Sequence, residues 1–434
     1  MNDEKETFVI QGTKALSGSI AVRGAKNDVL SLMASSLLFS HPVTFSNVPA
    51  ISDVEKMKIL LQGLGVRADV SQKKRTIAVD ASSLTHSLLD PALAEKIRAS
   101  VMLIGPVLAR LGEITLPYPG GCVIGKRPVD FFIEGFKKLG ATVNEKNGLF
   151  SFRLKKNDGG TIFLPYPSVT ATETLLMNAV LGHGITSIQN AACEPEVEHL
   201  AQFLISGGAN IKGAGTHTII VKGTRGELLS QKTKEAFPVL PDRIETGSFA
   251  VLAGVLGDPI RITGCLPHHV AALLERLRAT GVSIRIGDDW IEIQKPKTLS
   301  SVDIKTGPYP AFATDMQALF AVLLTQAIGQ SVVFETVFEE RLRYVEELRH
   351  MGANITVCDP HRAIVVGPTP LEGKNVKSPD LRAGLAFIIA GLIAKGESVI
   401  HNVYHIDRGY ERIEERLQAL GAHIERVNTE NNKA

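Results

Sequence analysis

A glycine that closes an amphipathic stretch and opens a strand-like run recurs six times along this 434-residue chain. The six positions are Gly65, Gly140, Gly208, Gly281, Gly352 and Gly421. Successive members lie 75, 68, 73, 71 and 69 residues apart. Spacing this regular indicates a repeated structural unit, and six units of about seventy residues fill the chain.

Each of these glycines follows a predicted helix with one apolar face. Val345, Leu348 and Met351 show the three- and four-residue spacing of such a face. Glycine adopts the left-handed conformation that ends a helix at little cost. We therefore expect six half-exposed helices, each ending at a repeat glycine.

A second predicted helix in each unit is apolar on nearly every side and rich in Ala, Gly and Ser. These stretches are residues 27–39, 98–112, 172–182, 245–257, 315–329 and 381–396. A helix without a polar face belongs in the interior of a protein. Alternating strand-like runs, such as residues 331–337, follow the apolar helices. In a doubly wound α/β sheet the strands would carry the continuous apolar runs instead, so the pattern favours helices inside and sheets outside.

The fold class that follows is α/β, as a two-domain inside-out barrel with three βαβαββ-like units per domain and buried helices surrounded by sheets. A chain of this length exceeds what one hydrophobic core fills. We expect one domain over residues 26–238 and a second over residues 239–434. The early strand-like segment stands outside the unit order, so we expect residues 1–25 to complete the second domain.

The overall charge excludes several classes of partner. There are 47 Lys and Arg against 45 Asp and Glu, a net charge of +2, and no basic run, so nucleic-acid binding is not expected. The charged N-terminus does not resemble a secretory signal, and no apolar run has the length of a membrane span, so no membrane partner is expected. Four cysteines lie far apart without metal-ligand spacing, which predicts reduced thiols in a cytoplasm. The oligomeric state does not follow from the sequence.

Polar and charged residues stand in the first turn of every apolar helix. They are Lys26 with Asn27, Arg98, Ser168 with Thr170, Arg243, Asp315, and Asp380 with Arg382. The helix dipole disfavours cations at this end, so the lysine and the arginines indicate an anionic ligand. Arg341 and Arg408 stand at two further helix junctions and are candidates for the same ligand. The alternative for each arginine is a salt bridge with a nearby acid.

The stretch from Pro119 to Asp130 contains the cysteine with the strongest signs of reactivity. Glycines on both sides of Cys122 predict an exposed loop, and the cations that follow would stabilise a thiolate. Cys193, near the start of a surface helix, is a weaker candidate. Cys265 and Cys358 lie in strand-like runs, where we expect small buried side chains.

With these features in place, the sequence resembles the UDP-N-acetylglucosamine 1-carboxyvinyltransferases, a family of enolpyruvyl transferases, nearly from end to end. The motifs that carry the resemblance are GAKN at residues 24–27, RAS at 98–100, PGGCVIGKRPVD at 119–130, SVTATE at 168–173, NAACEPE at 190–196, PDRIETG at 241–247, TDMQA at 314–318, DLRAG at 380–384 and DRGY at 407–410. The resemblance implies two domains, each a threefold bundle of buried helices surrounded by sheets, with the active site in the cleft between them. It implies that phosphoenolpyruvate and UDP-N-acetylglucosamine give the enolpyruvyl ether and phosphate, the first committed step of peptidoglycan precursor synthesis.

The resemblance also implies roles for individual residues. Cys122 would donate a proton to the methylene carbon, and Asp315 would accept the proton of the sugar hydroxyl. Lys26, Arg127 and Arg408 would bind phosphoenolpyruvate, with Asn27, Arg341 and Arg382 nearby. The residues implied for the nucleotide sugar are Arg98, Arg127, Pro128, Val129, Asp130, Phe131, Tyr166, Pro167, Ser168, Val169, Asp315 and Val337. No metal and no cofactor are expected, because cations and helix ends can neutralise the phosphates.

Two departures and two alternatives remain open. Thr170 and Ala313 replace the Gly and Pro that are common in the family, and Thr170 adds a side chain near the expected diphosphate. The nearest alternative enzyme is 5-enolpyruvylshikimate-3-phosphate synthase, which shares the fold and the donor but lacks the cysteine loop. The other alternative is an inactive paralogue that binds a nucleotide sugar.

Overall fold

The computed structural model describes residues 6–118, 120, 129–231, 233 and 235–428. Contacts within the chain divide it into two compact units. The terminal unit joins the described residues up to Arg23 to those from Pro241 onward, and the central unit holds the described residues between Gly24 and Leu240.

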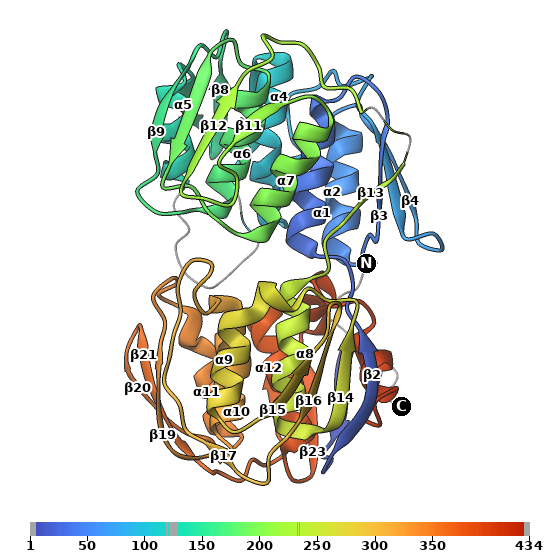
Figure 1. The fold of residues 1–434 in the computed structure, drawn as a ribbon, viewed down its shortest axis with the longest axis vertical. Helices are drawn as coiled ribbons and strands as arrows, with labels where there is room; N and C mark the ends of the chain where they lie inside the picture. Colours follow the sequence, from blue (N-terminus) through green and yellow to red (C-terminus); the bar gives the residue numbers. More distant parts are fainter. Residues whose placement is uncertain (1–5, 119, 121–128, 232, 234, 429–434) are drawn as a thin grey trace. The chain divides into compact units, whose positions relative to one another are not determined.

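Each unit is built around helices that are buried on every side. Those of the central unit are α1 (Lys26–Ser35), α4 (Ile104–Leu111), which continues the 3-10 turn η3 (Arg98–Leu103), and α6 (Val169–Val180). Those of the terminal unit are α8 (Arg243–Leu256), α10 (Gln317–Leu324), which continues η5 (Thr314–Met316), and α12 (Leu381–Ile393). Figure 1 shows α8, α10 and α12 side by side with strands around them. The prediction that helices rather than strands form the interior is confirmed.

One buried helix is shorter than its apolar run. We expected helix over residues 315–329, but α10 ends at Leu324 and β19 (Ala327–Phe334) begins shortly after. The hydroxyl of Thr325 donates to the carbonyl of Val322 at 2.6 Å and closes the last turn. The residues that follow pair with neighbouring strands, so sheet pairing overrides the helical pattern there.

The second helix of each repeat ends where the sequence indicates. These helices are α2 (Ser52–Gly63), α5 (Asp130–Lys138), α7 (Pro195–Ser206), α9 (Ala271–Ala279), α11 (Tyr344–His350) and α13 (Ile413–Gln418). The six repeat glycines have φ between 90° and 103°, the left-handed region that glycine favours. Only α7 departs from the expected half exposure: eight of its twelve residues are buried, because it packs against α1 and α6.

The described strands form six small sheets, three in each unit. In the central unit, the first sheet has the strand order β13 (Phe237–Pro238), β3 (Val43–Ser46), β5 (Thr76–Asp80), β4 (Arg67–Ser71). The second has the order β6 (Glu113–Pro117), β8 (Leu149–Arg153), β7 (Thr142–Lys146). The third has the order β11 (Asn210–Lys212), β12 (Thr218–Lys222), β10 (Ile185–Gln189), β9 (Gly159–Phe163). In the terminal unit, the first sheet has the strand order β22 (Asn375–Lys377), β23 (Glu397–His401), β1 (Glu6–Gln11), β24 (His423–Asn428). The second has the order β15 (Ser283–Ile286), β16 (Trp290–Gln294), β14 (Gly257–Thr263), β2 (Leu16–Ala21). The third has the order β17 (Leu299–Ser300), β19, β21 (Arg362–Gly367), β20 (Asn354–Asp359), and β18 (Ile304–Lys305) also pairs with β19. Buried helices with small surrounding sheets confirm the predicted fold class.

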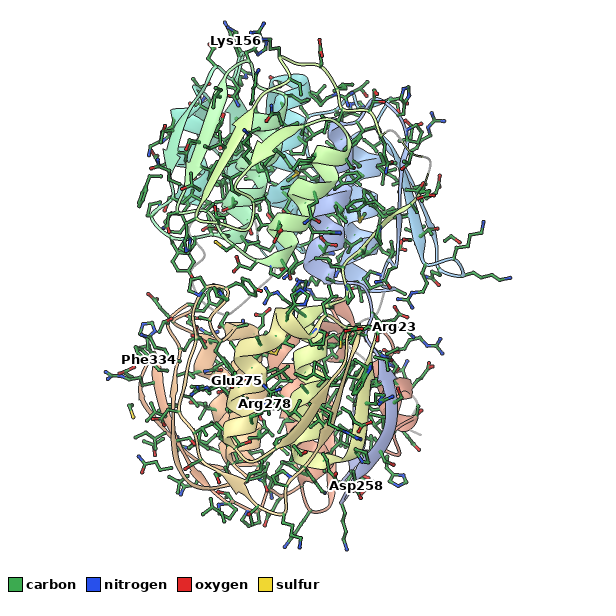
Figure 2. All side chains as sticks on the ribbon, viewed as in Figure 1. Arg23, Lys156, Asp258, Glu275, Arg278 and Phe334 are labelled. Atoms are coloured by element: carbon green, nitrogen blue, oxygen red, sulfur yellow. The ribbon has the colours of Figure 1, made fainter. Side chains whose placement is uncertain are left out.

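The N-terminal strands belong to the terminal unit. β1 pairs antiparallel with both β23 and β24, and β2 pairs parallel with β14. Phe8 and Ile10 of β1 are fully buried in the core of that unit. Side chains fill the space between the helices and sheets of each unit, as Figure 2 shows. In the described part of the chain, no helix combines the length and the apolar composition needed to cross a membrane.

Candidate functional site

In the central unit, the starts of three buried segments lie at the same end. The hydroxyl of Thr174 donates to the carbonyl of Val101 at 3.3 Å, and the amide of Asn178 donates to the carbonyl of Gly105 at 3.1 Å, so α4 and α6 run in the same direction. Glu173, near the start of α6, lies close enough to Asp28 of α1 to be affected by its charge. The N-terminal ends of η3, α6 and α1, which carry the positive ends of the helix dipoles, therefore lie close together.

Lys26 is held at this end by a buried acid. Its Nζ lies 2.6 Å from Oδ2 of Asp53, whose side chain is 1% exposed at the start of α2. Lys56 shares the same carboxylate at 3.5 Å. Because Asp53 is fixed by burial, it orients the Lys26 ammonium. Asn27 follows in the first turn of α1 and is half-buried.

The other predicted residues of the central unit frame the starts of η3, α5 and α6. The Ser168 hydroxyl caps α6 by accepting the N–H of Ala171 at 3.3 Å, and its own N–H donates to the carbonyl of Tyr166 at 2.7 Å. The half-buried members of this set are Arg98, Phe131, Tyr166, Pro167, Ser168, Val169 and Thr170. Val129 is buried just before α5 and Asp130 is exposed at its first residue. Cys122, Arg127 and Pro128 lie outside the described residues.

In the terminal unit, three predicted residues from distant parts of the chain meet. Asp315 accepts Nη2 of Arg341 on Oδ1 at 2.7 Å and Nε of Arg382 on Oδ2 at 3.1 Å. The two arginines are 4% and 5% exposed. The sequence left open whether each arginine binds a ligand or pairs with an acid of the protein, and both arginines pair with Asp315 here. They also fix the carboxylate between two guanidinium groups.

A buried hydroxyl network lies behind Arg382. Nη1 of Arg382 donates to the hydroxyl of Tyr410 at 3.4 Å, and that hydroxyl lies 2.9 Å from Oγ of Ser248 on α8. Burial opposes the charge of Arg382, but Asp315 and Tyr410 outweigh it and hold the guanidinium pKa above its usual value. Burial also raises the pKa of Tyr410. The guanidinium is therefore cationic and fixed in orientation.

Arg408 is the last residue of the 3-10 segment η7 (Val403–Arg408). The preceding residue, Asp407, fixes this segment in place. Asp407 makes a two-point contact with Arg426 of β24, at 2.7 Å to Nη2 and 3.0 Å to Nη1. Arg426 also binds Glu414 and Glu6. The N-terminal and C-terminal strands thus hold the segment that carries Arg408.

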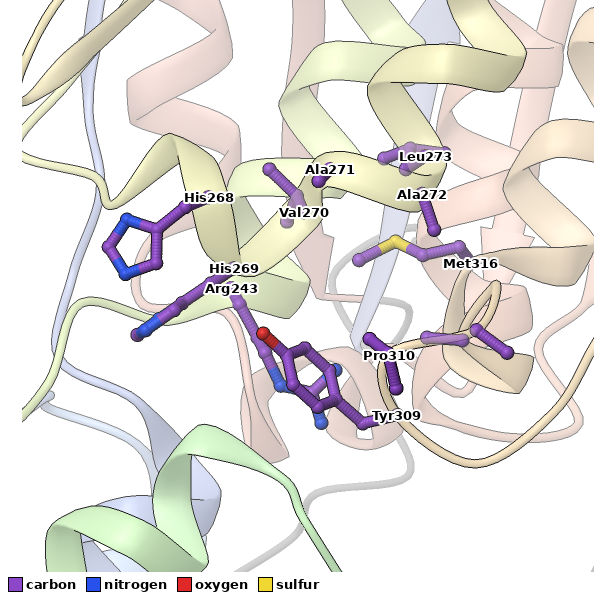
Figure 3. A pocket seen from close by; sticks show the side chains of 12 residues that line it. Arg243, His268, His269, Val270, Ala271, Ala272, Leu273, Tyr309, Pro310 and Met316 are labelled. Atoms are coloured by element: carbon purple, nitrogen blue, oxygen red, sulfur yellow. The ribbon is translucent and has the colours of Figure 1, made fainter. Parts of the chain in front are cut away.

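A pocket opens in the terminal unit beside the start of α8. Figure 3 shows Arg243 and Tyr309 close together in its lining, with the guanidinium carbon 5.8 Å from the ring centroid. His268 and His269 add two imidazoles, and Met316, next to Asp315 in sequence, lies on its apolar side. A cation and imidazoles beside an apolar wall suit an anionic group on an organic ligand.

Comparisons with known proteins agree along nearly the whole chain. The family model described as EPSP synthase (3-phosphoshikimate 1-carboxyvinyltransferase) matches residues 10–417. A UDP-N-acetylglucosamine 1-carboxyvinyltransferase of Desulforapulum autotrophicum is 43% identical over 418 residues, which cover 96% of this chain and 99% of the relative. The protein of that name from Gloeobacter violaceus is 44% identical over 96% of this chain and 90% of its own.

The chain belongs to the enolpyruvyl transferase family. The enolpyruvyl transferase NikO from Streptomyces tendae has the same fold, with a TM-score of 0.88 at 26% identity over 97% of this chain and 99% of that one. An EPSP synthase from Acinetobacter baumannii has a TM-score of 0.74 at 19% identity over 97% of this chain and 100% of that one, which is a likeness of fold alone.

The described cysteines of this enolpyruvyl transferase differ from one another. Burial, with the charge of Glu194, raises the pKa of Cys193, which argues against a thiolate there. Cys265 is buried, as expected. The expectation for Cys358 is wrong: it is exposed, because alternation along β20 places it on the face opposite the buried Ile355. Within the described residues, no cluster of three or more His, Cys, Asp or Glu side chains has the arrangement of a metal site.

Several residues that hold the site together were not singled out from the sequence. Asp53 and Asp28 stand at helix starts, where acids are common, so neither gives a distinctive signal. Glu335 does give a signal in the sequence. It continues the alternation of Ser331 and Val333, which are buried, so it belongs to the inward-facing side chains of this run. Tyr410 lies within the DRGY motif, but nothing in the motif indicates that its hydroxyl reaches Arg382.

Proposed function

We propose that this enolpyruvyl transferase moves the enolpyruvyl group of phosphoenolpyruvate to the 3-hydroxyl of UDP-N-acetylglucosamine and releases phosphate, the first committed step of peptidoglycan precursor synthesis. The observation that carries the proposal is the 43% sequence identity, over nearly the full length, to relatives named UDP-N-acetylglucosamine 1-carboxyvinyltransferase. The carboxylate of Asp315 between two buried arginines is consistent with it.

The reaction proceeds by addition and then elimination. In the addition, the 3-oxygen of the sugar bonds to C2 of phosphoenolpyruvate, its proton passes to Asp315, and Cys122 gives a proton to the methylene carbon. In the elimination, that carbon returns a proton to the Cys122 thiolate, and the bond from C2 to the phosphate oxygen breaks with its electron pair leaving on phosphate. Both steps need the phosphate and carboxylate charges to be held throughout.

The cations that the resemblance implies for the donor supply that charge. We assign the phosphoenolpyruvate contacts to Lys26, Arg127 and Arg408, with Asn27, Arg341 and Arg382 nearby. Guanidinium groups suit this role because they bind carboxylate and phosphate at two points. The sugar nucleotide contacts are those expected from the resemblance: Arg98, Arg127, Pro128, Val129, Asp130, Phe131, Tyr166, Pro167, Ser168, Val169, Asp315 and Val337.

The two arginines on Asp315 bear on its work as a base. A carboxylate that neutralises two guanidinium groups is a weak proton acceptor. When the anionic groups of phosphoenolpyruvate engage Arg341 or Arg382, those cations are shared with the substrate. Asp315 then becomes a better base, which places donor binding before proton removal from the acceptor.

We infer that the two units act as the two domains expected, 26–238 and 1–25 with 239–434, and that the enzyme works in the cytoplasm. The experiment that tests the function is acceptor-dependent phosphate release. Phosphoenolpyruvate is incubated with the protein and with either UDP-N-acetylglucosamine or shikimate 3-phosphate. We expect release only with the nucleotide sugar. Release only with shikimate 3-phosphate would assign the alternative enzyme, and no release with either would indicate an inactive paralogue.

A further inference from the structure

Glu335 is a fully buried carboxylate directly after β19, with no cation among the partners described for it. Oε1 accepts the hydroxyl of Thr306 at 3.0 Å and the N–H groups of Val337 and Phe338 at 2.7 and 3.2 Å. Oε2 accepts the hydroxyl of Thr314 at 2.8 Å. Four donors offset the cost of burying the charge.

Part of this arrangement is local. A side chain that accepts the N–H groups two and three residues ahead closes a turn, and Thr306 directly follows β18, which pairs with β19. A turn of this kind does not require the bond from Oε2 to Thr314. That bond reaches across to the residue that precedes Asp315.

The contacts close into a ring. Glu335 holds Thr314, which is covalently joined to Asp315. Asp315 binds Arg341, the N–H of Arg341 donates to the carbonyl of Phe338 at 3.3 Å, and the N–H of Phe338 returns to Glu335. Val337, the predicted sugar contact, lies inside the ring between Glu335 and Phe338. These bonds therefore restrain Asp315 relative to the turn that contains Val337.

We propose that Glu335 is a positioning residue: its carboxylate fixes the base Asp315 relative to the acceptor-binding turn at Val337. This inference rests on the proposed function of the site. The benefit is geometric, because small misplacements of a catalytic group lower the rate steeply. Glu335 touches neither substrate and acts only through its partners.

Replacing Glu335 itself is a poor test, because it would leave four donors without their acceptor. The two threonines can be compared, since each gives one hydroxyl to the same carboxylate; the Thr306 hydroxyl also accepts the N–H of Thr336 at 2.8 Å. Thr314→Val removes the bond that leads to Asp315, and Thr306→Val removes a bond that does not. Thr314→Ser keeps the hydroxyl and serves as the rescue variant.

Steady-state kinetics and melting temperature are measured for all three variants. We expect Thr306→Val to lower the melting temperature at least as much as Thr314→Val, because the Thr306 hydroxyl makes two hydrogen bonds at a buried position and the Thr314 hydroxyl makes one at a half-buried position. Thr314→Val should lower kcat about tenfold or more, whereas Thr306→Val and Thr314→Ser should stay within about threefold of the wild type. Equal kcat values for the two valine variants would overturn the inference.

The assay uses whichever acceptor supports turnover of the wild-type protein. If the wild type turns over only with shikimate 3-phosphate, the proposed function fails, while the comparison of Thr314→Val with Thr306→Val still decides the role of Glu335. If the wild type has no turnover with either acceptor, there is no base to position, and the inference falls with the function.

Discussion

Nδ1 of His199 lies 2.9 Å from Oδ1 of Asp28, and this contact is buried between α7 and α1. Oδ2 of the same carboxylate accepts the N–H of Leu240 at 2.8 Å. The ring of Phe237 covers His199, with 4.8 Å between the ring centroids. Asp28 therefore joins α1, which begins with Lys26, to α7 and to the segment where the chain leaves the central unit.

Removing the carboxylate should destabilise the central unit. Asp28→Ala leaves His199 and the N–H of Leu240 without their acceptor, and we expect the free energy of unfolding to fall by about 3 kcal/mol. Asp28→Asn retains an oxygen for one of these donors and should lose less. Urea unfolding at neutral pH measures both. An Asp28→Ala loss below about 1 kcal/mol would contradict the structural role of this pair.

Glu173 is a buried acid that is affected by the charges of Asp28, Glu194 and Glu196. Its side chain is fully buried on α6. Burial raises its pKa well above the ordinary 4.5, and the charges of Glu196, Asp28 and Glu194 raise it further, while the Ser31 hydroxyl opposes them. The folded protein therefore keeps the proton on Glu173 at pH values where the unfolded chain has lost it.

This difference predicts a pH-dependent gain on neutralising Glu173. The unfolded chain ionises near pH 4.5, the ordinary pKa of this group. Above that pH the wild type loses stability, by up to about 1.4 kcal/mol per pH unit, until the pH reaches the raised folded pKa. Glu173→Gln lacks this group, so its stability relative to the wild type should rise with pH over that window.

Urea unfolding from about pH 5 to about pH 8 checks the trend, since the expected difference accumulates across that range. Glu198→Gln, at an exposed position of α7, is the control, because solvent screens its charge. A difference between Glu173→Gln and the wild type that is flat with pH, or that shrinks as the pH rises, would contradict a raised pKa in the folded state.

The sequence predicted well those features that depend on a single continuous segment of the chain. A glycine after an amphipathic stretch reports a helix end, and an apolar run reports a buried helix, so the repeat and the helix starts that carry Lys26, Asp315 and Arg382 follow directly. The contacts of Asp28 with His199 and of Glu335 with Thr314 join residues 171 and 21 positions apart. Such pairings depend on how helices and strands pack, which a single sequence does not state.

The same reason explains the errors. Cys358 is exposed because it lies on the outer face of β20, opposite the buried Ile355, and α7 is largely buried because two helices cover it. The sequence of a short strand does not say which of its faces meets the core, and the periodicity of a helix does not say how many neighbours cover it. The roles of Arg341 and Arg382 show a further limit: the sequence indicated an anion, and the structure supplies Asp315 as one.

The two-point contact between Asp407 and Arg426 leads to a third prediction. Arg426→Lys keeps the charge but cannot reproduce that contact, so the segment that carries Arg408 should lose its fixed position. We expect KM for phosphoenolpyruvate to rise about threefold or more, with KM for the nucleotide sugar little changed.

The control for this prediction is Arg412→Lys. Arg412 pairs with Glu415 on the surface, with its side chain 69% exposed, and such pairs contribute little. Steady-state kinetics with each substrate varied in turn measures the effect. A rise confined to KM for the nucleotide sugar, or a similar rise in Arg412→Lys, would contradict the anchoring of Arg408.

The last prediction concerns the cysteine loop. If Cys122 donates the proton in the addition step, Cys122→Ser should lower kcat about a hundredfold or more, the usual scale for a general acid. The flanking glycines predict a loop outside the core, so the melting temperature should stay near that of the wild type. Cys193→Ser is the control and should retain turnover, since burial and Glu194 raise the pKa of that thiol.

A phosphonate epoxide that resembles the donor gives an independent readout, because it labels a reactive thiol irreversibly. Peptide mapping should find the label on Cys122, and phosphoenolpyruvate should slow the labelling by competing for the same cations. A label found only on Cys193, or a large fall in melting temperature for Cys122→Ser, would remove Cys122 from the mechanism and leave the proton donor to another group.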